Sequence, residues 1–279
     1  MATVILGLLA AVAWGCGDFG GGLLARRTAL FGVVFISQFV GLLLAFGLAL
    51  LRGETMPTPT DIGWSVAAGI CGVIGISSLY RGLAIGRMGV VAPVTGVMAA
   101  TIPVAAGIVL QGVPPPLVLA GIAMAVVAVV LVSRVSDGGD GPSGLGLALL
   151  SGAAIGAMSI AIAQLSDGHV FGPLTLIRTT QAVLIIAIVL VSRSAWRVEG
   201  RLVPAAAAVG VADMAGNALF IVAAQTGALA VAAVVSSLYP VTTVILATVF
   251  LGERVTRSHA FGIALAIAAI VCIGAGSAS

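Results

Sequence analysis

The stretch LGERVTRSH (residues 251–259) joins two long apolar runs, and about 140 residues earlier LQGVPPPLV (residues 110–118) joins two similar runs. The first connection contains Glu253, Arg254 and Arg257, whereas the second contains three prolines and no charged residue. Arginine and lysine accumulate in the loops on the cytoplasmic side of a membrane. If the apolar runs cross a bilayer, this difference in charge predicts that the two related connections lie on opposite membrane faces.

The composition of the chain requires an apolar surface. Hydrophobic residues make up 61% of the 279 residues, charged residues make up 8%, and the mean hydropathy is +1.27. A soluble domain has about 25% charged residues, so this chain cannot cover itself with polar groups and is expected to face lipid. The net charge of +3 derives from arginine alone, because the sequence has no lysine.

The same composition excludes several functions. Without lysine the chain has neither a P-loop lysine for phosphate nor a Schiff-base lysine. It shows no basic patch interleaved with aromatic residues, so no nucleic-acid partner is expected. Cys16, Cys71 and Cys272 are scattered in apolar runs, and we predict no metal, no cofactor and no redox role. The sequence has no HExxH or GxSxG pattern, which argues against an enzyme.

Ten apolar runs have the length of membrane-spanning helices. A bilayer core of about 30 Å needs roughly 20 apolar residues per helix, and the connections between the runs are too short to hold a soluble domain. The first run lacks the basic flank of a signal peptide, so we expect it to remain as a membrane helix. The predicted spans are roughly 2–24, 30–51, 62–84, 89–111, 114–133, 144–164, 172–192, 202–224, 229–251 and 256–277.

The two halves of the chain are related. A shift of about 140 residues lays the first five spans over the last five, and Tyr80 then falls on Phe220. Weak internal symmetry of this kind is typical of secondary transporters. We predict an all-α integral membrane protein with ten transmembrane helices in two inverted five-helix repeats, residues 1–137 and 138–279.

The arginines indicate how the chain is oriented. Five helices per repeat make the second repeat enter the bilayer from the opposite side, so equivalent loops should differ in charge. Arg87 marks the third loop, for example, and its counterpart QTGA (225–228) is neutral. We therefore predict that the odd-numbered loops lie in the cytoplasm and that both termini lie outside the cell membrane. The odd-numbered loops hold Arg26, Arg27, Arg87, Arg134, Arg193, Arg197, Arg201, Arg254 and Arg257, and the even-numbered loops hold only Arg52.

Three stretches carry a resemblance to a known family. LYRGLAIGRMGVVAPVTGV (79–97), WGCGDF (14–19) and the long run from VAAVVSSLYP to the GE pair and beyond (231–274) resemble the drug/metabolite transporter superfamily, EamA type. The resemblance covers the whole chain and implies ten helices in an inverted arrangement and the export of small metabolites. The first copy has QGVPPP where many members show a second GE pair.

Two polar residues near the middle of the eighth span are the first candidates for substrate contact. Asp213 and Asn217 lie one helical turn apart, so both point to the same side. An ionisable group inside a bilayer is costly and usually faces a cavity or a partner. Asp213 is expected to contact substrate amine groups or to take a proton, and the alternative is a bond to a neighbouring helix for assembly only.

Further charged candidates lie in spans one and seven. Arg178, followed by Gln181, either snorkels to the outer headgroups or clamps a substrate carboxylate, which a guanidinium binds through two hydrogen bonds. Asp18 lies one turn past Trp14, towards the cytoplasmic end of its span. It is either a packed helix end or part of the site, and pairing with Arg81 would offset much of its charge cost.

The remaining candidates border the expected cavity. Prolines free backbone carbonyls, and those of spans four and nine are interpreted as bends that flex during transport. Glu253 and Arg254 are predicted to end and cap span nine, with a latch to a neighbouring loop as the alternative. The substrate-binding candidates are completed by Gln38, Ser77, Tyr80, Ser236, Ser237 and Tyr239, and the prolines are Pro93, Pro103 and Pro240.

Taken together, these features favour a secondary transporter of the cell membrane that works by alternating access around a midplane cavity. Its partners are then a small-molecule substrate and the lipid bilayer. Amino-acid-like compounds are favoured as substrates, with sugars, nucleotide conjugates or drugs as alternatives, and a membrane binding or scaffold protein without flux is a second class. A homodimer, a coupling proton and the direction of flux are open at this stage.

Overall fold

The computed structural model describes residues 2–54, 57–111, 115–134, 144–166, 170–226, 235–236, 238–253 and 257–276. Within these ranges the chain forms ten α-helices, one short 3₁₀ helix and no strand, so the all-helical prediction is confirmed. The helices are α1 (Ala2–Ala25), α2 (Leu30–Arg52), α3 (Pro59–Ile85), α4 (Met88–Gln111), α5 (Pro116–Arg134), α6 (Leu145–Ile162), α7 (Phe171–Ser192), η1 (Gly200–Leu202), α8 (Val203–Thr226), α10 (Tyr239–Leu251) and α11 (Arg257–Gly276).

Several of these helices have the length and the surface of membrane-spanning segments. Six are long and apolar enough to cross a bilayer, namely α1, α2, α3, α6, α7 and the segment Gly200–Ala223. Shorter apolar helical segments are Met88–Ala99, Tyr239–Leu251 and Ala260–Cys272. Large apolar side chains point outward, with Leu51 85% and Val191 87% exposed. In water such a surface would favour association, and in lipid it is the expected surface. The number of ten crossings stays a prediction.

Glycine and capping residues mark the starts and ends of several helices. Gly53 follows α2 with φ of 63°, and Gly252 follows α10 with φ of 64°, a left-handed conformation that glycine adopts without a steric cost. Thr58 and Asp61 form a capping box at the start of α3. Arg193, 140 positions after Gly53, ends α7 in the same left-handed region with φ of 49°.

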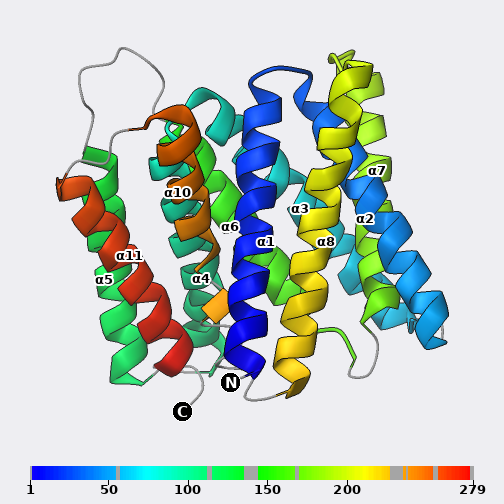
Figure 1. The fold of residues 1–279 in the computed structure, drawn as a ribbon. Coiled ribbons are helices and arrows are strands. Elements are labelled where there is room, and N and C mark those ends of the chain that lie inside the picture. Colours follow the sequence, from blue (N-terminus) through cyan, green and yellow to red (C-terminus); the bar gives the residue numbers. More distant parts are fainter. Residues whose placement is uncertain are drawn as a thin grey trace.

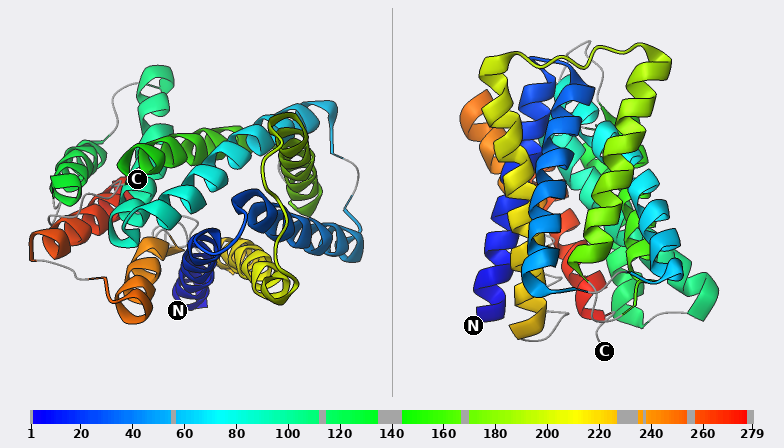
Figure 2. Two further views of the ribbon diagram at one scale, coloured as in Figure 1. Left: turned by 90° about the horizontal axis from the view of Figure 1, so that it is seen from above. Right: turned by 90° about the vertical axis from the view of Figure 1, so that its right-hand side faces the viewer.

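The helices stand in two rows that interleave the halves of the chain (Figures 1 and 2). In one row α1 packs between α8 and α10, and in the other α6 packs between α3 and α4. The pair α2–α7 closes one end of the seam between the rows, and the pair α5–α11 lies at the other end. The seam is thus walled by both halves, which is where side chains from distant parts of the sequence meet.

The two faces of the bundle differ in what they carry. In Figure 1, α1 begins and α11 ends at the lower face, and the α1–α2 turn, the α7–α8 connection and the end of α10 lie at the upper face. We call the upper face the arginine-rich face, because Arg26, Arg27 and residues 193–201 lie in its connections.

Span nine is described only in part. We predicted a helix over 229–251; α10 covers Tyr239–Leu251, and the predicted start lies outside the described residues, as do all of residues 227–234 and 237. Pro240 therefore stands in the first turn of α10, where its missing N–H has no helical partner to lose. That Pro240 flexes during transport stays a prediction.

Candidate functional site

A buried ion pair lies at the α2–α7 end of the seam. Arg178 of α7 donates through Nη2 to Asp213 Oδ2 of α8 and through Nη1 to Gln38 Oε1 of α2. Arg178 is only 7% exposed, whereas the Asp213 side chain keeps 29% exposure. Three helices thus bring together a cation, an anion and an amide that the sequence had named separately.

The position of Arg178 excludes the snorkelling interpretation in this structure, because its guanidinium turns inward and is buried. The guanidinium packs beside Gly41 of α2, where a β-carbon would lie in ordinary contact, 3.5 Å from Arg178 Nε. Among the described residues Nε itself has no hydrogen-bond partner. A buried guanidinium with one free donor is able to bind a further acceptor.

Asn217 and Asp18 flank Asp213 in different ways. Asn217 Nδ2 donates to the backbone carbonyl of Asp213 at 3.0 Å, so this part of its amide is bound to its own helix. Asp18 of α1 lies within electrostatic reach of Asp213, and Gly17 faces the backbone of α8 beside Asp213. Arg81, the predicted partner of Asp18, is exposed, and within the described ranges no cation pairs with Asp18. The site therefore holds two neighbouring carboxyl groups, of which Asp213 pairs with Arg178.

Tyr80 crosses the seam from α3. Its ring lies against Gly21 of α1, where a β-carbon would overlap the ring, and its hydroxyl lies near Ser37 of α2. Ser37 Oγ donates to the carbonyl of Val34 at 2.9 Å. Tyr80 is buried and lies within electrostatic reach of Asp18, Asp213 and Arg178, so it belongs to the same polar group.

Aromatic side chains form a second part of the site. The Trp14 ring lies 5.9 Å from the Phe220 ring and 6.4 Å from the Tyr239 ring, measured between centroids. Trp14 also packs against Gly216 of α8, one residue from Asn217, because a β-carbon there would lie 2.6 Å from its ring. Sequence reasoning named Trp14 and Tyr239 but missed Phe220. The repeat register contained the signal, because Phe220 occupies the position equivalent to Tyr80.

Other polar candidates lie at the α3–α7 contact. Gln181 is buried against Gly72 and Met158, and its Oε1 has no hydrogen-bond partner within the described ranges. Ser77 Oγ of α3 is likewise buried and without a partner in that part of the chain. Unsatisfied buried acceptors and donors are costly, so these two groups mark places where a polar ligand or water would be favoured.

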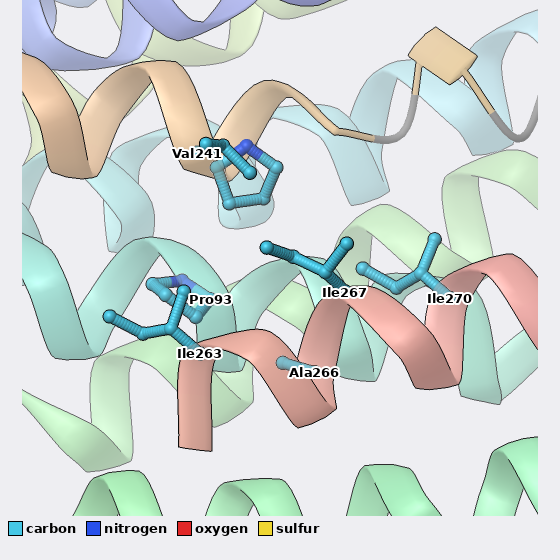
Figure 3. Close-up of a pocket in the computed structure, with 7 residues that line it drawn as sticks. Pro93, Val241, Ile263, Ala266, Ile267 and Ile270 are labelled. Atoms are coloured by element: carbon cyan, nitrogen blue, oxygen red, sulfur yellow. The ribbon is translucent and has the colours of Figure 1, made fainter. Parts of the chain in front are cut away.

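The candidates on span nine are only partly described. Ser236 is buried, whereas Ser237 and Arg254 lie outside the described residues, as does the side chain of Pro103. Pro93 and Pro240 line one small apolar pocket together with Val241 and side chains of α11 (Figure 3). That pocket has no polar lining and lies away from the Arg178–Asp213 pair, so it is not the candidate substrate site.

Glu253 ends its own helix through its backbone, since its N–H donates to the carbonyl of Ala247 in α10 at 3.3 Å, but its side chain binds elsewhere. Its carboxylate accepts from the backbone N–H groups of Met88 and Gly89, each at 3.0 Å, and so caps α4 in the first half of the chain. Its Oε1 also lies 3.6 Å from Arg26 Nη2. Sequence reasoning could not find this partner, because a cap supplied by another helix leaves no local pattern.

At the lower face, two carboxylates of the first half bind backbone of the second half. Glu54 accepts from the N–H groups of Val170, Phe171 and Gly172 at 2.8–3.3 Å, which caps the start of α7. Asp61 accepts from the N–H of Ser166 at 2.8 Å, after the end of α6. Neither residue was a sequence-based candidate. Over the described ranges no three His, Cys, Asp or Glu side chains converge as a metal site requires.

Comparison with known proteins adds two findings. A family model described as the EamA-like transporter family matches residues 1–134 and again residues 142–275. No curated protein matches the chain. A solved structure described as "Crystal structure of protein" shares the fold with a TM-score of 0.62 at 18% identity, over 97% of this chain and 95% of the other. That structural likeness concerns the fold alone.

Proposed function

The chain belongs to the EamA-like transporter family, and from this premise we propose that it exports small amino-acid-like zwitterions by alternating access at the seam. Members of this family move small molecules through membranes and are not enzymes. Multiple apolar helices place this chain in a membrane as well. The substrate class, the direction and the mechanism are what the proposal adds.

The Arg178–Asp213 pair is the observation that carries the proposal. A charge left unpaired in a bilayer costs several kcal/mol, so a site that releases one internal ion pair must replace it at once. A zwitterion meets this need, since its carboxylate takes the place of Asp213 at Arg178 while its ammonium pairs with Asp213. The exchange replaces one internal ion pair by two pairs with the substrate, so no charge is left unpaired, and Arg178 Nε supplies a further donor.

The aromatic side chains of Trp14, Phe220 and Tyr239 would receive the rest of such a substrate. They lie along the same row as Asp213, and Trp14 packs one residue from Asn217. Aromatic walls bind apolar or ring-bearing groups through a large contact area. Sugars and nucleotide conjugates lack the paired charges that the Arg178–Asp213 pair would match, so we place them second.

The pattern of helix contacts supports the inverted repeat that alternating access requires. Under the 140-residue shift α1 corresponds to α6 and α3 to α8, and α1 packs on α8 as α6 packs on α3. Likewise α2 packs on α8 as α7 packs on α3. The family model matches each half separately. We propose that the two repeats, divided near residue 137, rock against each other around the seam.

Counterflow of radiolabelled amino acids in proteoliposomes tests the proposal. The double variant Arg178→Gln with Asp213→Asn removes both charges of the pair and leaves neither partner unpaired, so the fold should persist while flux falls by about tenfold or more. The matched control is Arg201→Gln with Glu199→Gln, which removes an exposed ion pair and should change flux less than about twofold.

The charge requirement is tested on the substrate side. Analogues that lack either the ammonium or the carboxylate should fail to compete with the labelled amino acid, because each leaves one site charge unpaired. Normal flux in the folded Arg178 and Asp213 double variant, or equal competition by the uncharged analogues, would contradict the proposed site.

A further inference from the structure

Four helix ends from both halves of the chain meet at the arginine-rich face. Arg26, just after α1, donates through Nε and Nη2 to the carbonyl of Leu83 at 3.1 and 2.9 Å, and through Nη2 to the carbonyl of Gly86 at 3.1 Å. It thereby ties α1 to the end of α3. Glu253, just after α10, binds the first two N–H groups of α4 and lies beside the same guanidinium.

The contact of Glu253 with α4 is favourable for two reasons. The first N–H groups of a helix have no partner within the helix, and the helix dipole favours a negative charge at that end. The Glu253 side chain is only 14% exposed, so its charge-assisted bonds are little weakened by solvent. Gly252, with φ of 64°, turns the chain so that Glu253 reaches across to α4.

Next to these contacts, buried side chains fill the seam between the two rows of helices. Met88 and Leu83 are fully buried, and Gly22 of α1 leaves no room beside them, because its β-carbon would lie 2.5 Å from Leu83 Cβ and 3.1 Å from Met88 Cε. α1 also packs directly on α3 at this end. Within the described ranges the equivalent helices α6 and α8 show no comparable packing. The seam is therefore closed more firmly at the arginine-rich face.

We propose that Arg26 and Glu253 form a gate that holds this end of the seam closed and must release for the site to open to the arginine-rich face. The inference rests on the proposed alternating access. Because the equivalent stretch QGVPPP in the first half has no acidic residue, the opposite end has no matching carboxylate at that position. The gate is thus a feature of one repeat only.

Accessibility of a cysteine behind the gate tests this proposal without substrate. Val90, in the first turn of α4, is 5% exposed, and Val90→Cys is placed in a background in which Cys16, Cys71 and Cys272 are replaced by alanine. A membrane-impermeant maleimide is applied from the arginine-rich face. Glu253→Ala and Arg26→Ala should each raise the labelling rate on the order of tenfold, as loss of charge-assisted hydrogen bonds implies.

Three further variants separate the gate from general loosening. Glu253→Gln, which keeps one carbonyl acceptor, should give an intermediate rate. Glu199→Ala removes a glutamate on the same face whose side chain is 54% exposed, and it should leave labelling unchanged. Ala45→Cys, fully buried against α7 and α8, should stay unlabelled in the Glu253→Ala background.

Unchanged labelling of Val90→Cys in both alanine variants would overturn the gate, and so would an equal rise at Ala45→Cys. Because labelling needs no substrate, the two proposals fail separately. A gate response without zwitterion flux would contradict the proposed substrate alone, whereas flux with no gate response would contradict the gate alone.

Discussion

Gly21 and Gly47 both lie inside apolar helices, yet a side chain would meet different surroundings at each. A β-carbon at Gly21 would overlap the Tyr80 ring, whereas nothing lies within 4 Å of the same position at Gly47. At the residue scale, then, the seam depends on a few glycines that let a ring or a neighbouring helix approach closely. The sequence alone does not distinguish the two glycines, because both are flanked by apolar residues.

We expect Gly21→Ala to lower the melting temperature of the detergent-solubilised protein. Overpacking of a filled interior costs about 1–3 kcal/mol. Gly47→Ala, the matched control, should be neutral or stabilising by up to roughly 1 kcal/mol, because alanine favours a helix. Thermal unfolding followed by intrinsic fluorescence measures both, and equal melting temperatures would show that Tyr80 is not fixed against α1.

At the scale of single elements, most helix bounds follow from hydropathy because lipid demands continuous apolar runs. The predicted starts and ends of α1, α2 and α7 agree with the structure to within about two residues. The predicted start of span nine, residue 229, lies outside the described residues, and its predicted end at residue 251 agrees with the end of α10. The caps that tie helices to one another were missed, because Glu54 and Glu253 act on backbone far away in the sequence.

Helix α7 is the element whose position matters most to the site, because it carries Arg178. Glu54 accepts three of the N–H groups at or beside its first turn, and Arg52 lies over the Phe171 ring at 5.3 Å. The end of α2 thus holds the start of α7 in place. Removing this cap should loosen the first turn and shift the guanidinium that lies two turns further along.

Glu54→Ala should therefore raise hydrogen exchange at residues 171–174 and lower stability by about 0.5–2 kcal/mol, the usual cost of a lost helix cap. Substrate affinity should fall with it, as α7 positions Arg178. Exchange measured by mass spectrometry checks the first effect, and Glu199→Ala serves as the control because that side chain is exposed. If the first turn of α7 exchanges no faster in Glu54→Ala than in the unaltered protein, Glu54 does not act as its cap.

At the scale of the whole molecule, two interleaved rows enclose a polar seam. Asp213, Arg178 and Gln38 could each be named from the sequence, because ionisable or amide groups inside apolar runs are conspicuous. Their mutual contact could not be named, since it depends on which helices become neighbours. Phe220 was not predicted as a site residue, because an aromatic residue in an apolar run is not distinguishable from one that only packs against its neighbours.

The proposed inverted arrangement of the repeats makes a prediction about the membrane. Thr60, at the start of α3, and Gly200, at the start of η1, are 140 positions apart, and both are exposed. Thr60→Cys and Gly200→Cys, each in the cysteine-free background, should react with an impermeant maleimide from opposite sides of the bilayer. Labelling of inside-out and right-side-out vesicles measures this, and reaction of both from one side would refute the inversion.

The contacts of Glu253 have a consequence for the conformation that such a carrier would adopt when no substrate is bound. If the proposed gate is present in only one repeat, the two resting states differ in energy, and the empty protein would wait with its site open to the lower face. This bias cannot alter the final concentration ratio that a passive carrier reaches. It does weaken the apparent affinity on the disfavoured side by the fraction of molecules that are open there. A solute approaching from the arginine-rich face would then need a higher concentration for half-saturation than the same solute approaching from the other.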